Sequence, residues 1–375
     1  MKVAIDIRRV RDYGPGTYTR NLVNTLARLD LETSYALLGT SADWTELGSL
    51  PQNFALLEFD RGGTGARHDL RLGWALRRQK VQVYHSPYLI TPWVLPCRHV
   101  VTVHDTADFQ DWLSDGSSLA DLLRFQRVRL GLLRARRILS VSQATRRDLQ
   151  RIFGLPADRI EVVYNALDAR LERTPTPEEV QRTLGRYSVA SPYVLYAGNV
   201  KPHKNLPRLI EAFALVKDQL RGHPHYADLK LIIIGEALSQ HPQLRRAVIQ
   251  SRTQQDVRFL GFVDPQTLSV FYARAAVFAF PSLHEGFGLP PLEAMAQGTP
   301  VVSSNAAALL EVLGEAAWFV NPENVFELSR GIRQVLLDEP LRKQLVERGR
   351  QQVRRFSWEE SVRRVLEVYR EAARP

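Results

Sequence analysis

Cysteine is almost missing from this chain of 375 residues, in which Cys97 is the only example. A lone cysteine excludes a disulfide within the chain and favours a reducing compartment. No apolar run approaches the ~20 residues that a helix needs to cross a membrane. Residues 2–6 have the composition of a strand rather than that of a signal peptide. We therefore expect a cytoplasmic protein. The Cys and His spacings of zinc sites are also missing.

Negative charge is in short supply, because 50 Lys and Arg residues face only 40 Asp and Glu residues, for a formal net charge of +10. Such an excess indicates an anionic partner, which could be nucleic acid, an anionic membrane surface or a phosphorylated substrate. The sequence has no aromatic signature of RNA binding, no low-complexity tail and no short-period repeat. Charge alone does not choose among the three partners.

The length suits two domains of about 170 residues each. Strand-like runs alternate with helix-compatible segments, which predicts α/β domains with parallel sheets and helices on both faces. In the first half of the chain these runs are residues 2–6, 54–57, 81–84 and 99–103. The predicted parts are a first Rossmann-like domain at 1–168, an irregular linker at 169–190, a second such domain at 191–355 and a C-terminal helix at 356–375.

Two glutamates lie close together in a predicted strand, loop and helix. Residues 277–280 have the composition of a strand, and the pair Pro290-Pro291 fits the first turn of a helix. Glu285 lies in the loop and Glu293 in the first helical turn, so we expect different tasks for the two carboxylates. A helix N-terminus at the carboxyl end of a strand attracts phosphate. The backbone groups available to such a ligand belong to Gly286, Phe287, Gly288 and Leu289.

Three further stretches follow predicted strands. Gly14 and Gly16 predict a turn, although the third glycine of the dinucleotide fingerprint is missing. His104 stands at the end of the run 99–103, where it is either a ligand-binding or a structural histidine. Lys204 precedes a predicted helix that Asn205 would cap, and it offers a point charge for a diphosphate or is an ordinary surface lysine.

Residues 281–302 carry the glutamate pair together with glycines and prolines, and they closely resemble the E-x7-E motif of retaining GT-B glycosyltransferases of family 4 (glycosyltransferase group 1). The chain looks most like the bacterial mannosyltransferases of that family. The resemblance covers essentially the whole chain. It implies two doubly wound Rossmann-like domains that face a cleft, with the acceptor on the first and the donor on the second. It also implies that the C-terminal helix crosses back to the first domain.

The resemblance assigns roles at the reacting end of the donor. Glu285 would position the donor sugar, Glu293 would hold the ribose hydroxyls, and His104 would lie beside the sugar. The turn of Gly14 and Gly16 would lie over the donor diphosphate.

In the second domain the resemblance implies that Lys204 binds the donor phosphates. An arginine that also binds them in the family is replaced by Asn199 here, and Lys201 is a candidate substitute. Backbone groups in the turn around Val263 would hold the nucleobase.

The implied reaction is the transfer of a hexose, with mannose as the best guess, from a nucleotide-diphosphate donor such as GDP-mannose. The acceptor would be a polysaccharide, lipid-linked or other glycan, and the anomeric configuration would be retained. No convincing D-x-D pair is present, which agrees with chemistry that needs no metal. The nucleotide sugar would be a co-substrate, and no other cofactor is expected.

A basic segment at residues 119–137 has leucines interleaved with arginines, among them Arg124, Arg127, Arg134 and Arg137. One hypothesis is that this face meets an anionic membrane or a lipid-diphosphate acceptor, which would place the protein on the inner face of the membrane. The other is a helix that packs on the core with a solvated basic face.

Two other classes of protein remain open. An epimerase or phosphorylase of the GT-B fold would share the architecture, but the first needs no acceptor and the second uses free phosphate. A non-catalytic nucleic-acid binder would explain the charge but would leave Glu285, Lys204 and His104 without a task. Salt-sensitive binding to random duplex would favour it.

Overall fold

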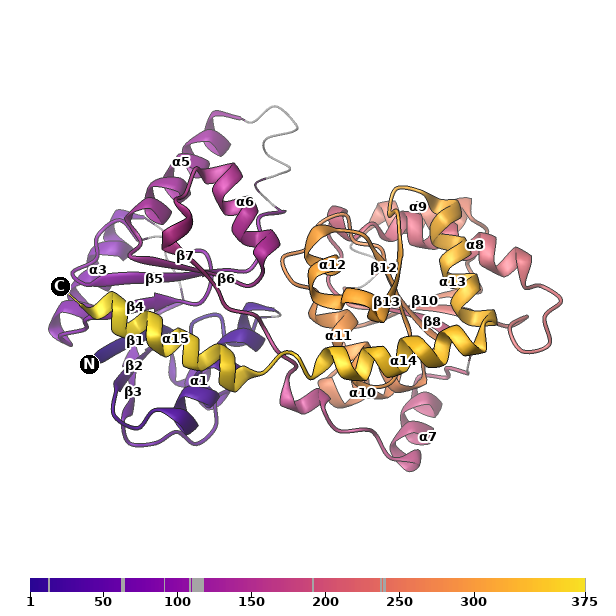
Figure 1. The fold of residues 1–375 in the computed structure, drawn as a ribbon, viewed down its shortest axis with the longest axis horizontal. Helices are drawn as coiled ribbons and strands as arrows, with labels where there is room; N and C mark the ends of the chain where they lie inside the picture. The colour runs from indigo at the N-terminus through magenta and orange to yellow at the C-terminus, as the bar shows by residue number, and fades with distance from the viewer. Residues whose placement is uncertain are drawn as a thin grey trace. The chain divides into compact units, whose positions relative to one another are not determined.

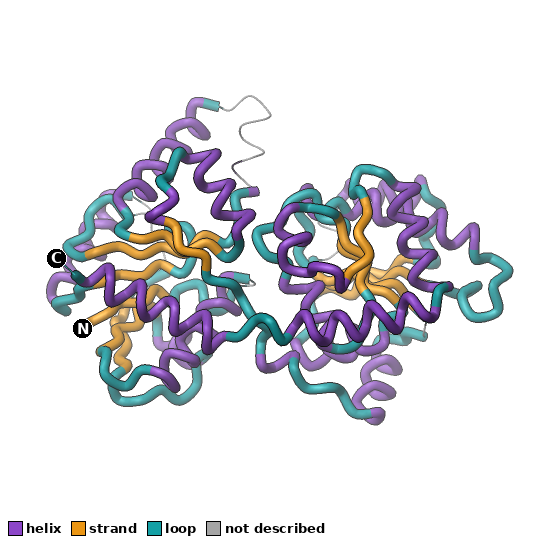
Figure 2. Tube along the Cα trace, in the orientation of Figure 1, coloured by secondary structure: helices purple, strands orange, loops and turns teal. Residues whose placement is uncertain are grey.

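The computed structural model describes residues 1–12, 14–61, 65–90, 92–107, 109, 118–190, 192–236, 238 and 241–374. The chain divides into two compact units. Unit 1 comprises Met1–Asn165 and Ser357–Pro375, and unit 2 comprises Ala166–Phe356. Figure 2 shows that each unit has strands at its centre and helices around them.

The sheet of unit 1 is parallel, with the strand order β3-β2-β1-β4-β5-β6-β7. Its strands are β1 (Lys2–Asp6), β2 (Ser34–Gly39), β3 (Phe54–Glu58), β4 (Val83–Ser86), β5 (Arg98–Val103), β6 (Arg137–Ser140) and β7 (Ile160–Val162). The helices are α1 (Pro15–Leu29), α2 (Ser41–Thr45), α3 (Ala66–Arg78), α5 (Leu119–Arg134), α6 (Gln143–Phe153) and α15 (Trp358–Ala373). The chain reverses its winding between β1 and β4, and in such sheets the carboxyl ends of the strands at this point are where ligands usually bind.

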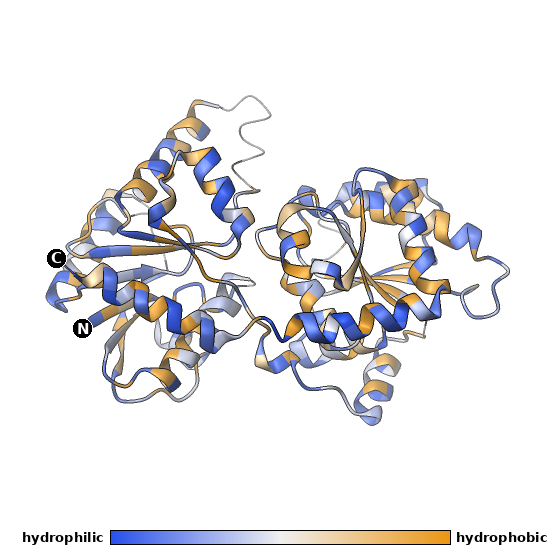
Figure 3. Ribbon diagram, viewed as in Figure 1, coloured by the Kyte–Doolittle hydropathy of each residue, from blue (hydrophilic) through white to orange (hydrophobic). Residues whose placement is uncertain are grey.

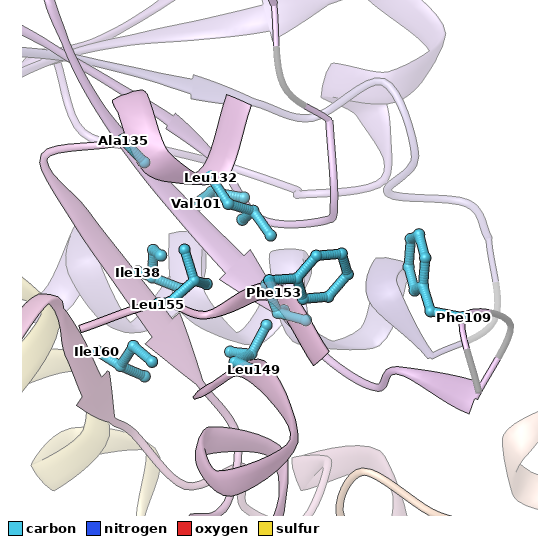
Figure 4. Packing of buried hydrophobic residues seen from close by; sticks show 10 residues of the cluster. Val101, Phe109, Leu132, Ala135, Ile138, Leu149, Phe153, Leu155 and Ile160 are labelled. Carbon is cyan, nitrogen blue, oxygen red and sulfur yellow. The ribbon is translucent and has the colours of Figure 1, made fainter. Parts of the chain in front are cut away.

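Apolar side chains fill both faces of this sheet. On one face, α5 and α6 pack against β5 and β6 around Phe153 and other buried residues (Figure 4). The ring of Phe153 contacts Phe109 and Phe125, with ring centroids 5.0 and 5.2 Å apart. On the same face, Leu72 and Leu76 of α3 pack against β1, β2 and β4. The helices α1 and α15 pack on the opposite face. Each such fully buried side chain contributes roughly 1.5–3 kcal/mol through removal of apolar surface from water.

The C-terminal helix α15 belongs to unit 1, where it contacts α1, β4 and β5 (Figure 1). Its apolar stripe is buried, and the hydroxyl of Tyr369 lies 2.5 Å from Nδ1 of His85 in β4. Nε2 of the same ring lies 2.8 Å from the hydroxyl of Thr102 in β5. Burial lowers the pKa of His85 to about 3, so its imidazole is neutral and can accept one hydrogen bond and donate one. These contacts hold α15 in register on the sheet.

The sheet of unit 2 is also parallel, with the order β10-β9-β8-β11-β12-β13. Its strands are β8 (Tyr193–Ala197), β9 (Lys230–Ile234), β10 (Val257–Gly261), β11 (Val277–Phe280), β12 (Val301–Ser304) and β13 (Ala317–Val320). The helices are α7 (Pro177–Arg186), α8 (Leu206–Gln219), α9 (Pro242–Gln250), α10 (Pro265–Arg274), α11 (Leu289–Ala296), α12 (Ala307–Leu313), α13 (Val325–Leu337) and α14 (Glu339–Val353). These strands are mostly buried and hydrophobic, and the helices carry both polar and apolar residues (Figure 3). Here the winding reverses between β8 and β11.

The prediction of an irregular linker at 169–190 is wrong. Residues 177–186 form α7, which begins with a complete capping box between Thr176 and Glu179. The stretch packs on unit 2, where the ring of Tyr187 contacts Phe271 edge-to-face and the amide of Gln297 donates to the carbonyl of Leu171 at 2.5 Å. The pair of prolines near residue 175 suggested irregular structure, yet Pro177 serves as the first residue of a helix.

Candidate functional site

An ion pair lies at the reversal point of unit 2. Nζ of Lys204 is 2.6 Å from Oε1 of Glu285, and the two side chains are only 12% and 10% exposed. Lys204 follows β8 and Glu285 follows β11, and these two strands are neighbours in the sheet. The carboxyl ends of neighbouring parallel strands meet at one edge, so residues 81 positions apart come together. The sequence predicted both residues for the donor site but not their contact.

The two loops that carry this pair are fastened to each other. The backbone N–H of Leu283 donates to the carbonyl of His203 at 2.7 Å. The side chain of Asn205 donates to the carbonyls of Pro281 and Pro322, at 3.1 and 2.7 Å. Asn205 was expected to cap α8, but it has a φ of 60° and makes no side-chain cap. Its buried amide instead joins the β8 and β11 loops, which holds the ion pair in place.

The N-terminus of α11 follows Glu285 directly. Gly288 precedes the helix with a φ of 100°, and a Cβ there would lie 2.4 Å from the side chain of Leu309. Glycine is therefore required both by conformation and by space. Pro290 and Pro291 occupy the first turn as predicted. Pro290 and Pro291 have no backbone N–H, so the donors that this helix start can offer to a ligand come from the backbone that precedes them, and the start of a helix suits an anionic ligand.

Glu293 lies in the second turn of α11, one turn later than predicted. Its carboxylate accepts a hydrogen bond of 2.8 Å from the hydroxyl of Tyr272 in α10. Burial raises the pKa of Glu293 to about 7, in spite of the Tyr272 bond that stabilises the charged form; Asp168 raises the pKa further and Arg170 lowers it. Glu293 is thus a carboxyl that titrates near neutrality, whereas Glu285 is held by a lysine.

We expect Glu293 to make stability depend on pH. The pKa of Glu293 in the folded protein, about 7, lies above the ordinary value of 4.5. Its contribution to the free energy of unfolding is therefore fully present below pH 4.5 and is lost as the pH rises through 7. Glu293→Gln removes this loss. The unfolding free energy of the variant, relative to the native protein, should rise by about 2–3 kcal/mol between pH 5 and pH 8. Urea unfolding at the two pH values measures it, with Glu315→Gln at an exposed carboxylate as the control. Parallel pH profiles for the native protein and Glu293→Gln would contradict the assignment.

The other residues predicted in unit 2 differ in their surroundings. Asn199 and Lys201 are exposed in the β8 loop, and the carbonyl of Asn199 accepts a bond of 2.9 Å from Tyr196. Val263 lies in the turn between β10 and α10. The side chain of Phe287 is buried against Phe356, with ring centroids 5.4 Å apart. Phe287 can therefore serve a ligand only through its backbone.

His104 lies at the carboxyl end of β5 in unit 1. Its Nε2 is 2.9 Å from the carbonyl of Pro87, which follows β4, so this nitrogen carries the proton. Burial lowers the pKa of His104, and its neutral ring has its lone pair on Nδ1. The ring meets Tyr18 of α1 edge-to-face, with centroids 4.9 Å apart. Tyr18 also lies 3.2 Å from the Thr102 hydroxyl, which links His104 to the contacts under α15.

The glycine turn of unit 1 begins α1. Gly14 has a φ of 71° and precedes Pro15. A Cβ at Gly16 would lie 2.4 Å from the carbonyl oxygen of Val10, so no other residue fits without movement of the backbone. The turn thus brings the start of α1 close to the segment that follows β1.

Several polar residues near these sites were not predicted from the sequence. In unit 1, Asp6 at the end of β1 and Arg8 just after it form a buried ion pair of 2.6 Å, and Tyr84 donates to Asp6 at 2.7 Å. In unit 2, Glu236 follows β9 and lies 2.8 Å from Nε2 of His241. The only sequence signal was their position after a strand. Their partners lie on other elements and give no local pattern.

The basic helix α5 packs on the core through part of its surface, as the second hypothesis required, and its arginines have different surroundings. Arg127 lies 3.8 Å from Asp69 of α3. Arg137 lies outside the helix, as the first residue of β6. It is not available to a membrane, because its guanidinium contacts Glu371 of α15 at 2.8 Å and the carbonyl of Asp158. Arg134 is exposed and stacks over Trp93, 5.4 Å from the ring centroid. Among the described residues, no helix combines the length and apolarity that a bilayer crossing requires.

Comparison with solved structures identifies the class of fold. HepE from Anabaena, solved with UDP and glucose, matches with a TM-score of 0.78 and 18% identity, over 99% of this chain and 100% of that chain. The two parallel, doubly wound units are those of the GT-B glycosyltransferases, as predicted.

Comparison of sequences identifies the family. Residues 13–171 match the model of Glycosyltransferase Family 4, and residues 186–352 match that of glycosyl transferases group 1. The O-antigen chain mannosyltransferase B of Escherichia coli is 35% identical over 307 residues, which are 81% of this chain and 78% of that protein. The serotype-specific mannosyltransferase WbdA of Escherichia coli is 30% identical over 238 residues, 63% of this chain and 29% of that protein. The chain belongs to the group 1 glycosyltransferases of family 4.

Proposed function

We propose that this glycosyltransferase transfers mannose from a nucleotide-diphosphate donor to a hydroxyl of a polysaccharide or lipid-linked glycan, with retention of configuration and without a metal. The bond between the anomeric carbon and the diphosphate oxygen breaks, and a bond to the acceptor oxygen forms. The proton of the acceptor hydroxyl leaves as that bond forms, and the departing phosphate can take it. The main demand on the protein is the negative charge that develops on the diphosphate.

The observation that carries the proposal is the Lys204–Glu285 pair beside the N-terminus of α11. A mostly buried ammonium group and the backbone at the start of a helix are a suitable set of donors for a diphosphate, because both are fixed before the ligand arrives. Lys204 and the backbone of residues 286–289 would stabilise the leaving group, and this charge is the reason that we propose metal independence. Lys201, exposed in the same loop, would approach the outer phosphate oxygens.

The carboxylates would hold the two sugars of the donor. Glu285 is fixed by Lys204 and would accept hydrogen bonds from hydroxyls of the transferred sugar. Glu293 would accept them from the ribose, and Tyr272 orients its carboxylate. The turn at Val263 would hold the base. For His104, Gly14 and Gly16, which belong to unit 1, the proposal keeps the roles that the family resemblance implies.

Mannose is proposed because the similar Escherichia coli proteins are named as mannosyltransferases. The same names favour an O-antigen type of polysaccharide as the acceptor. GDP-mannose is the donor to test first.

A panel of nucleotide-diphosphate sugars tests the proposal, with thermal shift for binding and slow hydrolysis for nucleotide release, in the presence of EDTA. GDP-mannose should stabilise the protein and release GDP, and an added acceptor should increase the release. Conversion of the donor to an epimer, or a strict need for free phosphate, would instead identify one of the alternative enzymes. Loss of all activity in EDTA would contradict metal independence.

A further inference from the structure

A cavity of about 370 Å³ opens in unit 1 at the amino ends of β5 and β6, beside the last turn of α5. Ligand pockets of proteins begin at about this size. His104 follows the carboxyl end of β5. The neighbouring strands β4 and β6 run parallel to β5, so their amino ends, where the cavity lies, are at the opposite edge of the sheet from His104. The cavity is therefore separate from the donor and acceptor chemistry, and none of the roles above uses it.

The lining of the cavity is strongly basic. It includes four exposed arginines, Arg98, Arg134, Arg136 and Arg159, and none of the described residues that line it is acidic. Arg159 donates to the carbonyl of Leu133 at 2.7 Å, which holds its guanidinium at the rim. Arg134 is held over the ring of Trp93. Arginines that line one cavity, with no acidic residue in its described lining, suit a phosphate, which guanidinium groups can bind in pairs of hydrogen bonds.

The surface beside the cavity is apolar. Trp93 and Val94 are each 48% exposed in the loop before β5, and Leu130 of α5 is 39% exposed. Further along α5, Leu122 and Leu123 are 48% and 64% exposed. Figure 3 shows hydrophobic residues along this helix. Soluble proteins seldom expose such a group of large apolar residues without a partner. Tryptophan beside arginine is typical of surfaces that enter the interfacial region of a bilayer.

We propose that this cavity binds the phosphate of an anionic lipid headgroup, while Trp93, Val94 and the exposed leucines of α5 enter the lipid interface. The combination argues for a lipid over a soluble phosphate compound, since only the lipid uses both the arginines and the adjacent apolar surface. It replaces part of the hypothesis drawn from the sequence. Arg134 stays in the binding surface, Arg137 does not, and Arg98, Arg136 and Arg159 are added to it.

Flotation of the full chain with phosphatidylcholine vesicles, with and without phosphatidylglycerol, tests this proposal. The native protein should float only with the anionic vesicles. Arg98→Gln/Arg136→Gln should lower this partition about tenfold or more, since each basic residue near an anionic surface contributes ~1 kcal/mol. The matched control is Arg245→Gln/Arg246→Gln on α9 of unit 2, which removes the same charge from an exposed helix and should keep the partition within twofold. Equal losses for both pairs would overturn the proposal, because they would show attraction by net charge alone.

Fluorescence identifies the source of the phosphate. Trp93→Phe should remove the blue shift that anionic vesicles cause in the tryptophan emission of the native protein. Soluble glycerol 1-phosphate is then added to the anionic vesicles at the same phosphate concentration. If it displaces the native protein from them, a free metabolite is the ligand and the lipid proposal fails. Random duplex DNA that binds more tightly than the vesicles would also overturn it. Donor hydrolysis in solution should be unchanged in Arg98→Gln/Arg136→Gln, so this test and that of the proposed function can fail independently.

Discussion

Lys204→Met should lower kcat/KM for the nucleotide sugar by roughly 100- to 1000-fold, the cost of removing one fixed charge donor from a developing anion. The ammonium group lies 2.6 Å from Glu285 and has little contact with water, so no solvent charge can take its place without rearrangement. Affinity for the free nucleoside diphosphate should fall as well, since the ground state also carries the diphosphate. Steady-state kinetics and calorimetric titration with the diphosphate measure the two effects. An unchanged diphosphate affinity would contradict the role of Lys204.

Stability must be separated from catalysis in this variant. Removal of one partner leaves the Glu285 carboxylate mostly buried and unpaired, which costs about 3 kcal/mol or more. Lys204→Met/Glu285→Gln removes both charges and should recover most of that stability, while kcat/KM stays as low as in the single variant. Lys230→Met is the matched control. Lys230 is the first residue of β9, at the amino ends of the strands and away from Lys204, and it pairs with Asp256. It should leave kcat/KM within about threefold.

Glu285→Gln should lower kcat by roughly 100-fold or more and change KM by only a few-fold. The amide keeps the shape and one acceptor oxygen, so the donor can still bind. It lacks the negative charge that would stabilise the electron-deficient sugar of the transition state, and the difference therefore falls on turnover.

Two comparisons sharpen the test of Glu285. Glu315→Gln makes the same chemical change at a carboxylate that is 87% exposed in unit 2, and it should leave kcat unchanged. A Glu285→Gln enzyme with normal kcat and a large rise in KM would show that the residue only binds the donor. In that case the sugar-positioning role would belong to another group.

Local sequence was a good guide to the loop between β11 and α11. Gly288 and the proline pair predicted where α11 starts, because positive φ and a missing backbone N–H are properties of single residues. The same reasoning failed at Asn205, since a cap is only one use of an amide side chain. In the folded chain the amide of Asn205 donates instead to two carbonyls from distant loops, those of Pro281 and Pro322.

Properties of a residue that depend on a contacting side chain far away in the sequence could not be predicted. The pKa of Glu293 depends on burial and on Tyr272, which lies on the preceding helix and gives no signal at the glutamate. Arg134 and Arg137 look alike in the sequence. One lines an open cavity and the other is bound to Glu371, 234 residues further along the chain.

The sequence by itself determined the alternation of strands and helices, the family, and the residues at the ends of β5, β8 and β11, because hydrophobic period, glycine and proline act over a few residues. Only the tertiary structure decided that β8 and β11 are neighbours, and hence that Lys204 neutralises Glu285. It also decided which groups α15 meets in unit 1, as in the contact of Tyr369 with His85, and that arginines from β5, α5 and the segment before β7 share one cavity. The physical reason is that strand order in a parallel sheet depends on which buried faces pack together, and this is a property of the whole chain.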